Sequence, residues 1–129
     1  MKKKILTSIA TFCLLMGITV TALASQNFDF TIRPPFIGSM VSSNLVTVTT
    51  GMSPFVNPNV SATPTTYFLS PQRVSSTQAT QLISNVSTAG RRNFTYLTGY
   101  GGVGNRYCLS AYPSNTSFLE YRVTGTWSP

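Results

Sequence analysis

The fold is decided by residues 119–127, which read Leu-Glu-Tyr-Arg-Val-Thr-Gly-Thr-Trp. Apolar or small side chains occupy every second position, from Leu119 through Val123 to Trp127, and polar side chains stand between them. A period of two is typical of a half-buried β-strand, because successive side chains point to opposite faces of the sheet. This segment is therefore predicted to be a strand with one face in the core.

The same alternation recurs upstream, between stretches rich in proline or glycine. Residues 74–83 fit a helical turn or a polar edge strand equally well, with Val74, Leu82 and Ile83 as expected core positions. No helix of normal length is indicated, and short strands at this spacing predict an all-β chain, a small antiparallel β-sandwich of about six or seven strands. The other predicted strands are residues 28–32, 45–50, 65–69, 93–100 and 107–112.

Two connections in this scheme carry specific expectations. Residues 51–64 contain Pro54, Pro58 and Pro64, so they are predicted to form a Pro-rich loop. The glycines of 101–105 predict a hairpin that joins the strands on either side. The glycine spacing from Gly99 to Gly104 also matches a dinucleotide-binding pattern, but the strand predicted after it leaves no helix N-terminus for a phosphate.

The first 24 residues have the pattern of a secretory signal peptide. Lys2, Lys3 and Lys4 precede an apolar stretch over residues 5–20, and Ala22-Leu23-Ala24 fits the small-residue cleavage rule. Cleavage is expected between Ala24 and Ser25. The division is then a signal peptide at 1–24 and one secreted domain at 25–129, extracellular or associated with the cell wall, with no membrane span after signal removal.

The charge of the predicted mature domain is moderately positive. Two acids, Asp29 and Glu120, face six arginines, which leaves +4. This balance suits anionic polymers or lipid head groups and also serves solubility. No basic run accompanies it, so nucleic-acid binding is not expected. Arg91 and Arg92 stand at the entry of the predicted 93–112 hairpin and Arg106 stands at its tip, and the three form the candidate anion-binding site.

Catalytic groups are scarce in the predicted domain. It contains no His and no Lys, so a Ser or Cys nucleophile has no ordinary base. Asp29 and Glu120 lie on different predicted strands, and a glycosidase pair is not expected from them. Neither a metal site nor a cofactor is expected, and the domain is interpreted as non-enzymatic.

Cys108 and Trp127 carry two structural expectations. Cys13 leaves with the signal peptide, so Cys108 has no partner within the domain and is either buried or paired between molecules. Its place in an alternating apolar stretch favours burial. Trp127 is expected to be buried against Phe28 and Phe30 of the first strand.

The order of features resembles a family of small exported proteins of Gram-positive bacteria, a domain of unknown function. The features that match most distinctively are the opening Phe-Asp-Phe-Thr-Ile of 28–32 and the terminal Val-Thr-Gly-Thr-Trp of 123–127. The resemblance implies export and a β-rich domain, and no activity. In organisation the chain is also similar to lactococcin-972-like bacteriocins, which are small, exported and β-rich.

Two functions are therefore compatible with the sequence. The first is a secreted module that binds an anionic envelope polymer or lipid, or a protein partner through its many tyrosines. The alternative is a bacteriocin-like antibacterial effector.

Overall fold

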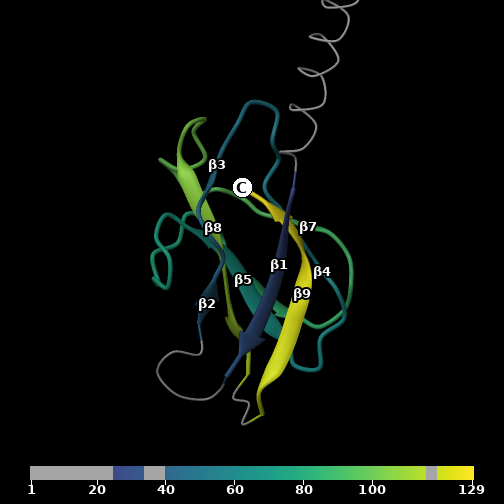
Figure 1. The fold of residues 1–129 in the computed structure, drawn as a ribbon. Helices are drawn as coiled ribbons and strands as arrows, with labels where there is room; N and C mark the ends of the chain where they lie inside the picture. The colour runs from purple at the N-terminus through teal and green to yellow at the C-terminus, as the bar shows by residue number, and fades with distance from the viewer. Residues whose placement is uncertain (1–24, 34–39, 116–118) are drawn as a thin grey trace, which may run out of the picture.

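The computed structural model describes residues 25–33, 40–115 and 119–129, and these form β-strands without a helix (Figure 1). The predicted signal peptide and Ala24 lie outside the described residues, whereas Ser25 stands just before the first strand. The strands are β1 Gln26–Ile32, β2 Val41–Ser42, β3 Val46–Thr47, β4 Phe55–Pro58, β5 Thr65–Ser70, β6 Ile83–Val86, β7 Arg92–Asn93, β8 Arg106–Pro113 and β9 Tyr121–Ser128.

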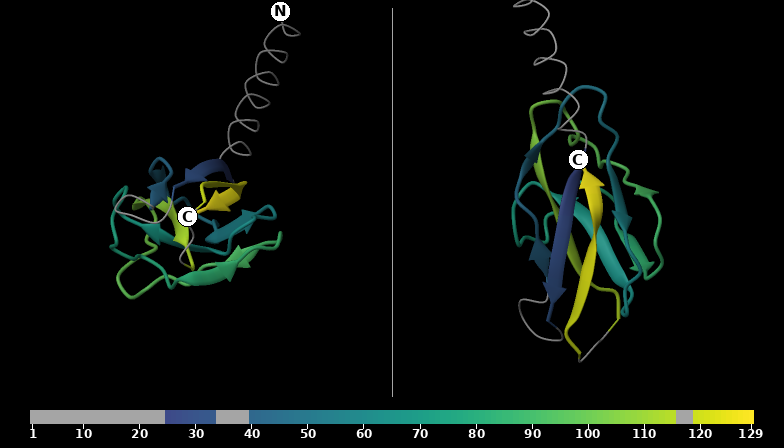
Figure 2. Two further views of the ribbon diagram at one scale, coloured as in Figure 1. Left: turned by 90° about the horizontal axis from the view of Figure 1, so that it is seen from below. Right: turned by 45° about the vertical axis from the view of Figure 1, so that its right-hand side comes forward.

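The strands form two antiparallel sheets. One has the order β1-β9-β4-β7, and the other has the order β2-β8-β5-β6, with β3 also paired to β8. In Figures 1 and 2, β1 and β9 lie side by side in one layer, with β5 and β8 in the layer behind them. The prediction of a small antiparallel β-sandwich is confirmed.

The first and last strands pair along their whole length. Their register runs from Gln26 opposite Trp127 to Ile32 opposite Tyr121, without a bulge. Along β1, Phe28, Phe30 and Ile32 are buried, and the residues between them are exposed. The alternation seen in both segments is therefore the inside–outside pattern of a sheet with one face on the core.

The core lies between the sheets and receives aromatic side chains from both. Trp127 is 1% exposed, as predicted, and belongs to the same cluster as Phe28 and Phe30. From the opposite sheet, Tyr67 packs on Phe28 in an edge-type contact, with ring centroids 5.9 Å apart and an interplanar angle of 61°. The other buried members of the cluster are Ile32, Val48, Val56, Leu69, Ala79, Val86, Phe94, Tyr107, Leu109, Ala111, Tyr121 and Val123.

The predicted 93–112 hairpin is wrong. Its second strand exists as β8, but β8 pairs with β2, β3 and β5, and residues 94–105 contribute only an isolated bridge from Tyr96 to Thr80. The first predicted strand is reduced to Arg92–Asn93 of β7, and the chain later turns through Gly99 and Gly101, which have a left-handed backbone. The amide of Gly101 then donates to the Tyr107 hydroxyl at 2.8 Å, so the glycines fold back over β8 without extending it.

The Pro-rich loop prediction for 51–64 is also wrong in its middle. Residues 55–58 form β4, which lies between β9 and β7. Pro58 is the last residue of β4, where a missing amide donor is tolerated. Val56 is fully buried, so tertiary packing on β9 outweighs the local preference of the prolines for a loop.

The expected core positions of residues 74–83 are only partly correct. Val74 is 63% exposed and Leu82 is 40% exposed, whereas Ile83 packs at the edge of the core. The residues that enter the interior are Ala79 and Thr80. The Ala79 amide donates to the Leu69 carbonyl and the Thr80 hydroxyl accepts from the Leu69 amide, which ties this segment to β5.

Candidate functional site

The outer face of the β5–β8 sheet is covered, unlike that of its partner sheet. Every residue of β5 is buried, although only Thr65, Tyr67 and Leu69 alternate toward the core. Phe68 points to the outer face and is still only 1% exposed. In β8, Cys108 and Ser110 face outward and are fully buried. A second layer of chain must therefore lie over this sheet.

Residues 71–78 provide part of this layer, and we call them the strap. The Gln72 carbonyl accepts from Cys108 Sγ at 3.4 Å, and the Val74 amide donates to Ser42 Oγ of β2 at 3.0 Å. Val74 has a φ of 49°, a left-handed conformation that is unfavourable for a β-branched side chain. The surrounding hydrogen bonds hold this strained residue in place.

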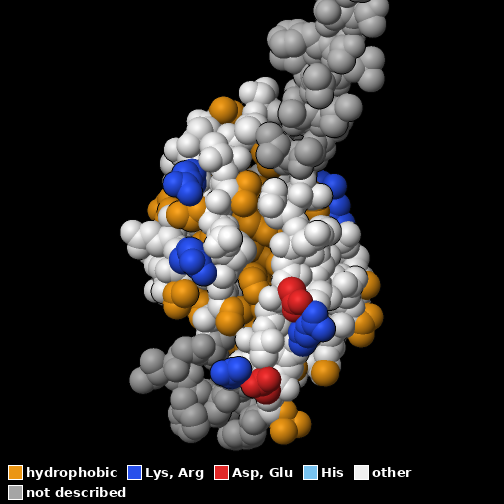
Figure 3. Space-filling view, in the orientation of Figure 1, with side chains coloured by type: hydrophobic (Ala, Val, Ile, Leu, Met, Phe, Trp, Pro, Cys, Tyr) orange, Lys and Arg blue, Asp and Glu red, His pale blue; other side chains and the backbone are white. Residues whose placement is uncertain are grey.

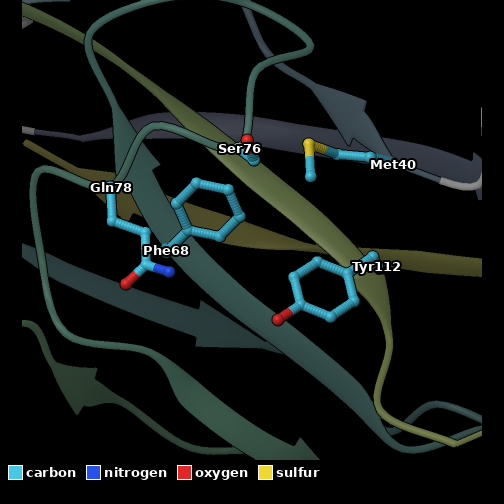
Figure 4. A pocket seen from close by; sticks show the side chains of 5 residues that line it. All are labelled: Met40, Phe68, Ser76, Gln78 and Tyr112. Carbon is cyan, nitrogen blue, oxygen red and sulfur yellow. The ribbon is translucent and has the colours of Figure 1, made fainter.

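A pocket of about 280 Å³ opens beneath the strap (Figure 4). The rings of Phe68 and Tyr112 line it, with centroids 6.2 Å apart and an interplanar angle of 66°; because Phe68 is only 1% exposed, the accessible aromatic surface comes mainly from Tyr112. Met40 lies along one side, and Ser76 and Gln78 come from the strap. None of the described residues that line the pocket carries a charge.

Three polar groups of the pocket are free for a ligand. Within the described residues, the side chains of Ser76, Gln78 and Tyr112 make no hydrogen bond to the protein. The pocket therefore offers two hydroxyls and one amide beside aromatic and thioether surface. The amide and the hydroxyls can both donate and accept.

The outer face of the other sheet has a different character. A shallower hollow of about 370 Å³ lies there and is lined mainly by amide, carboxylate and hydroxyl side chains. Asn59 Nδ2 already donates to Thr124 Oγ1 at 2.8 Å. The remaining lining residues are Asn27, Phe28, Asp29, Asn57, Gly125 and Thr126.

The candidate anion-binding arginines are divided between the two sheets. Arg91 and Arg92 adjoin one another at β7, the edge strand beside β4, whereas Arg106 begins β8 and pairs with Thr47 of β3. In Figure 3 the blue side chains on the visible face stand in separate groups, two of them beside acidic ones. The sequence placed all three around one hairpin, and that hairpin does not form.

Both acidic side chains of the chain are already engaged. Arg33 Nε lies 2.9 Å from Glu120 Oε2, and Arg122 donates from Nε to Asp29 Oδ1 at 2.7 Å, with a second contact to Oδ2. The hydrogen bond from Arg122 holds the pKa of Asp29 below its usual range, so this carboxylate stays ionised. Each acidic side chain thus forms an ion pair with an arginine on the other side of the β1–β9 pair.

Cys108 is buried as expected. Its Sγ donates to the carbonyls of Ser70 and Gln72 at 3.5 and 3.4 Å. Burial raises the pKa of the Cys108 thiol, with weaker opposing contributions from hydrogen bonds to Ser110 and Ser42. A protonated, enclosed thiol is a poor nucleophile. Across the part of the chain that the structure describes, no three His, Cys, Asp or Glu side chains form a metal-binding group.

Sequence reasoning missed the pocket. One signal was available, because Tyr67-Phe68-Leu69 is a continuous apolar run and not an alternating one, which indicates a strand covered on both faces. Met40, Ser76 and Gln78 gave no such signal, since they lie outside the strands.

The comparisons with known proteins identify no relative. No family model, no curated protein and no solved structure matches this chain. In addition, none of residues 25–33, 40–115 and 119–129 belongs to a helix long and apolar enough to cross a membrane.

Proposed function

We propose that this chain is exported and acts without catalysis as a module that binds anionic polymer or lipid of the cell envelope. The proposal rests on an uneven pairing of charges, because the acidic side chains are all paired and most of the arginines are not. Both acidic side chains are paired, with Arg33 and Arg122, so four arginines have no carboxylate partner. The four are Arg73, Arg91, Arg92 and Arg106.

Arg91 and Arg92 are adjacent cations, and each is held by contacts with its neighbours. The Arg91 guanidinium stands 4.0 Å above the Phe55 ring, and its Nε donates to Asn93 Oδ1. Arg92 donates from Nη1 to the carbonyls of Thr88 and Gly90. These acceptors are neutral, so both guanidinium charges remain available. Guanidinium groups that are already oriented lose less freedom when they bind a phosphate.

Export and the lack of catalysis rest on the sequence. Lys2 to Lys4, the apolar stretch and Ala22-Leu23-Ala24 support a cleaved signal peptide. Beyond residue 24 the chain has neither His nor Lys to activate a nucleophile. Intact mass of the released protein tests this part, and a species that retains Met1 would contradict it.

The binding proposal is tested by co-sedimentation with purified cell wall and with anionic vesicles across a salt series. Arg91→Ser with Arg92→Ser is compared with Arg73→Ser with Arg106→Ser, which removes the same charge elsewhere. A basic side chain near an anionic surface contributes about 1 kcal/mol, so the β7 double variant should bind at least about tenfold more weakly. The matched variant should lose less.

Salt dependence provides the second criterion. Exposed charges are screened over about 8–10 Å at ordinary ionic strength, so retention should fall as salt rises. Binding that ignores salt and both double variants would remove the electrostatic proposal and favour a protein partner. Equal loss in both variants would show that net charge acts, without a site at β7.

A further inference from the structure

We propose that the pocket beneath the strap is a binding site for a neutral ring that carries hydroxyl groups, such as a pyranose sugar. The pocket lies on the β5–β8 sheet; Arg73 belongs to the strap, but neither it nor the other arginines discussed above are among the lining residues. The proposal is therefore independent of anion binding and assigns the domain a second kind of ligand.

The outer face of the β5–β8 sheet is unusually apolar at the pocket. The outward side of an antiparallel sheet is usually polar, as it is around Asn27, Asn57 and Thr124 in the partner sheet. Here Phe68, Tyr112 and Met40 gather on that side instead. The strap covers Phe68 but leaves a hollow between these side chains (Figure 4). The core between the sheets does not require aromatic residues on this face.

The second argument is the chemistry of the lining. The half-buried Tyr112 ring and the Met40 thioether accept the C–H face of a ring. Gln78, Ser76 and Tyr112 present an amide and two hydroxyls that have no hydrogen-bond partner among the described residues. An ionic ligand would find no countercharge there. A ring with an apolar face and hydroxyls around its edge satisfies both halves of the pocket.

The third argument is size and preorganisation. A volume of about 280 Å³ lies just below the common range of ligand sites, about 300 to 1,000 Å³, so one ring fits better than a chain of rings. The strap is tied down through Gln72 and Val74, and Val74 is held at a φ of 49°. Strained residues are concentrated at ligand sites, where the surrounding structure fixes them.

The methyl group of Met40 offers a direct probe. The protein is produced in its host with [¹³C-methyl]methionine and collected in its released form. It is then titrated with methyl β-glucoside, methyl N-acetyl-β-glucosaminide and phenol. The Met40 resonance should shift with the glycosides in a saturable way. Met52 is the internal control, because its sulfur accepts from the Thr49 amide outside the pocket.

Two conservative variants identify the hydrogen bonds. Gln78→Ala and Tyr112→Phe should each weaken glycoside binding by about fivefold to tenfold, the usual effect of one lost hydrogen bond. Gln81→Ala and Tyr100→Phe remove matching groups elsewhere on the surface and should leave the titration unchanged. Circular dichroism checks that every variant remains folded.

The outcomes separate the alternatives. A Met40 shift with phenol alone would overturn the sugar assignment, and an absent response to all three probes at millimolar concentration would overturn the site itself. Binding unaffected by Gln78→Ala and Tyr112→Phe would overturn the proposed hydrogen bonds. The serine variants of Arg91 and Arg92 should bind the glycosides normally, so failure of the envelope proposal leaves this test intact.

Discussion

Gly125 of β9 lies directly opposite Phe28 of β1, and a Cβ atom on Gly125 would come within 2.9 Å of the Phe28 ring. The same atom would stand 2.7 Å from Pro58 Cα of β4 and would overlap the Asn57 carbonyl oxygen. The absent side chain therefore allows the first, fourth and last strands to pack as one sheet.

Gly125→Ala should consequently destabilise the domain. Overpacking costs about 1–3 kcal/mol, and more where backbone must move, as it must at Asn57 and Pro58. Urea unfolding followed by Trp127 fluorescence measures the change. Thr126→Ala is the matched control on the same strand and should shift the midpoint little. Equal stability of Gly125→Ala and the natural protein would show that β4 can shift at little cost to make room for the added methyl group.

Tyr67→Phe should leave the domain as stable at neutral pH, or stabilise it by up to about 1 kcal/mol. Among the described residues the buried Tyr67 hydroxyl makes no hydrogen bond of normal geometry; Thr65 lies close enough to lower its pKa, but the Thr65 hydroxyl is bonded to Tyr121. Removal of this poorly satisfied polar atom eliminates its desolvation cost. Thermal unfolding at pH 7 measures this. A clear loss of stability in the variant would indicate a partner for this hydroxyl, such as a buried water molecule.

The same residue predicts a specific alkaline instability. Burial raises the pKa of Tyr67 to about 12, whereas an unfolded tyrosine titrates near 10. A pKa raised in the folded state gives stability that is fully present below about pH 10 and is lost as pH rises toward 12. Tyr67→Phe should reduce this loss, and Tyr100→Phe, a more exposed position, should not. Unfolding curves from pH 8 to 12 test the difference.

Trp127→Ala should cost about 3–5 kcal/mol, the usual range for a buried aromatic residue. Trp127 is 1% exposed and closes the core where β9 meets β1 and β4. Val103→Ala, at a position that is 68% exposed, should change stability by less than about 0.5 kcal/mol. Denaturant unfolding followed by circular dichroism suits both variants, since the first lacks the fluorophore.

The Cys108 thiol should react with a disulfide reagent only when the structure opens. It is fully buried, it donates to two carbonyls, and burial raises its pKa. Labelling should be slow in the native protein and should accelerate as denaturant favours opening. Rapid labelling without denaturant would mean that the strap opens readily.

The alternating sequence pattern is sufficient to predict an all-β fold and the inner and outer faces of the most regular strands. In residues 28–32 buried and exposed side chains alternate without interruption. In residues 121–127 the expected inward residues Tyr121, Val123 and Trp127 are buried and Arg122 is exposed, whereas 124–126 are all half-buried, so the local pattern predicts most of the tertiary burial. The burial of Trp127 follows from the same alternation, whereas Cys108 faces outward from β8 and is buried beneath Ser70 and the strap. These features depend on a period that is visible within one segment.

Only the tertiary structure decided which segments pair and what lies outside the sheets. Residues 55–58 are a strand because β9 and β7 provide partners on both sides, and residues 94–105 are not a strand because β8 is paired elsewhere. The pocket joins Met40, Phe68, Gln78 and Tyr112, which are separated along the chain. Contacts between distant segments leave no local period in the sequence, so pairing, ion pairs and pocket were fixed by packing of the whole domain.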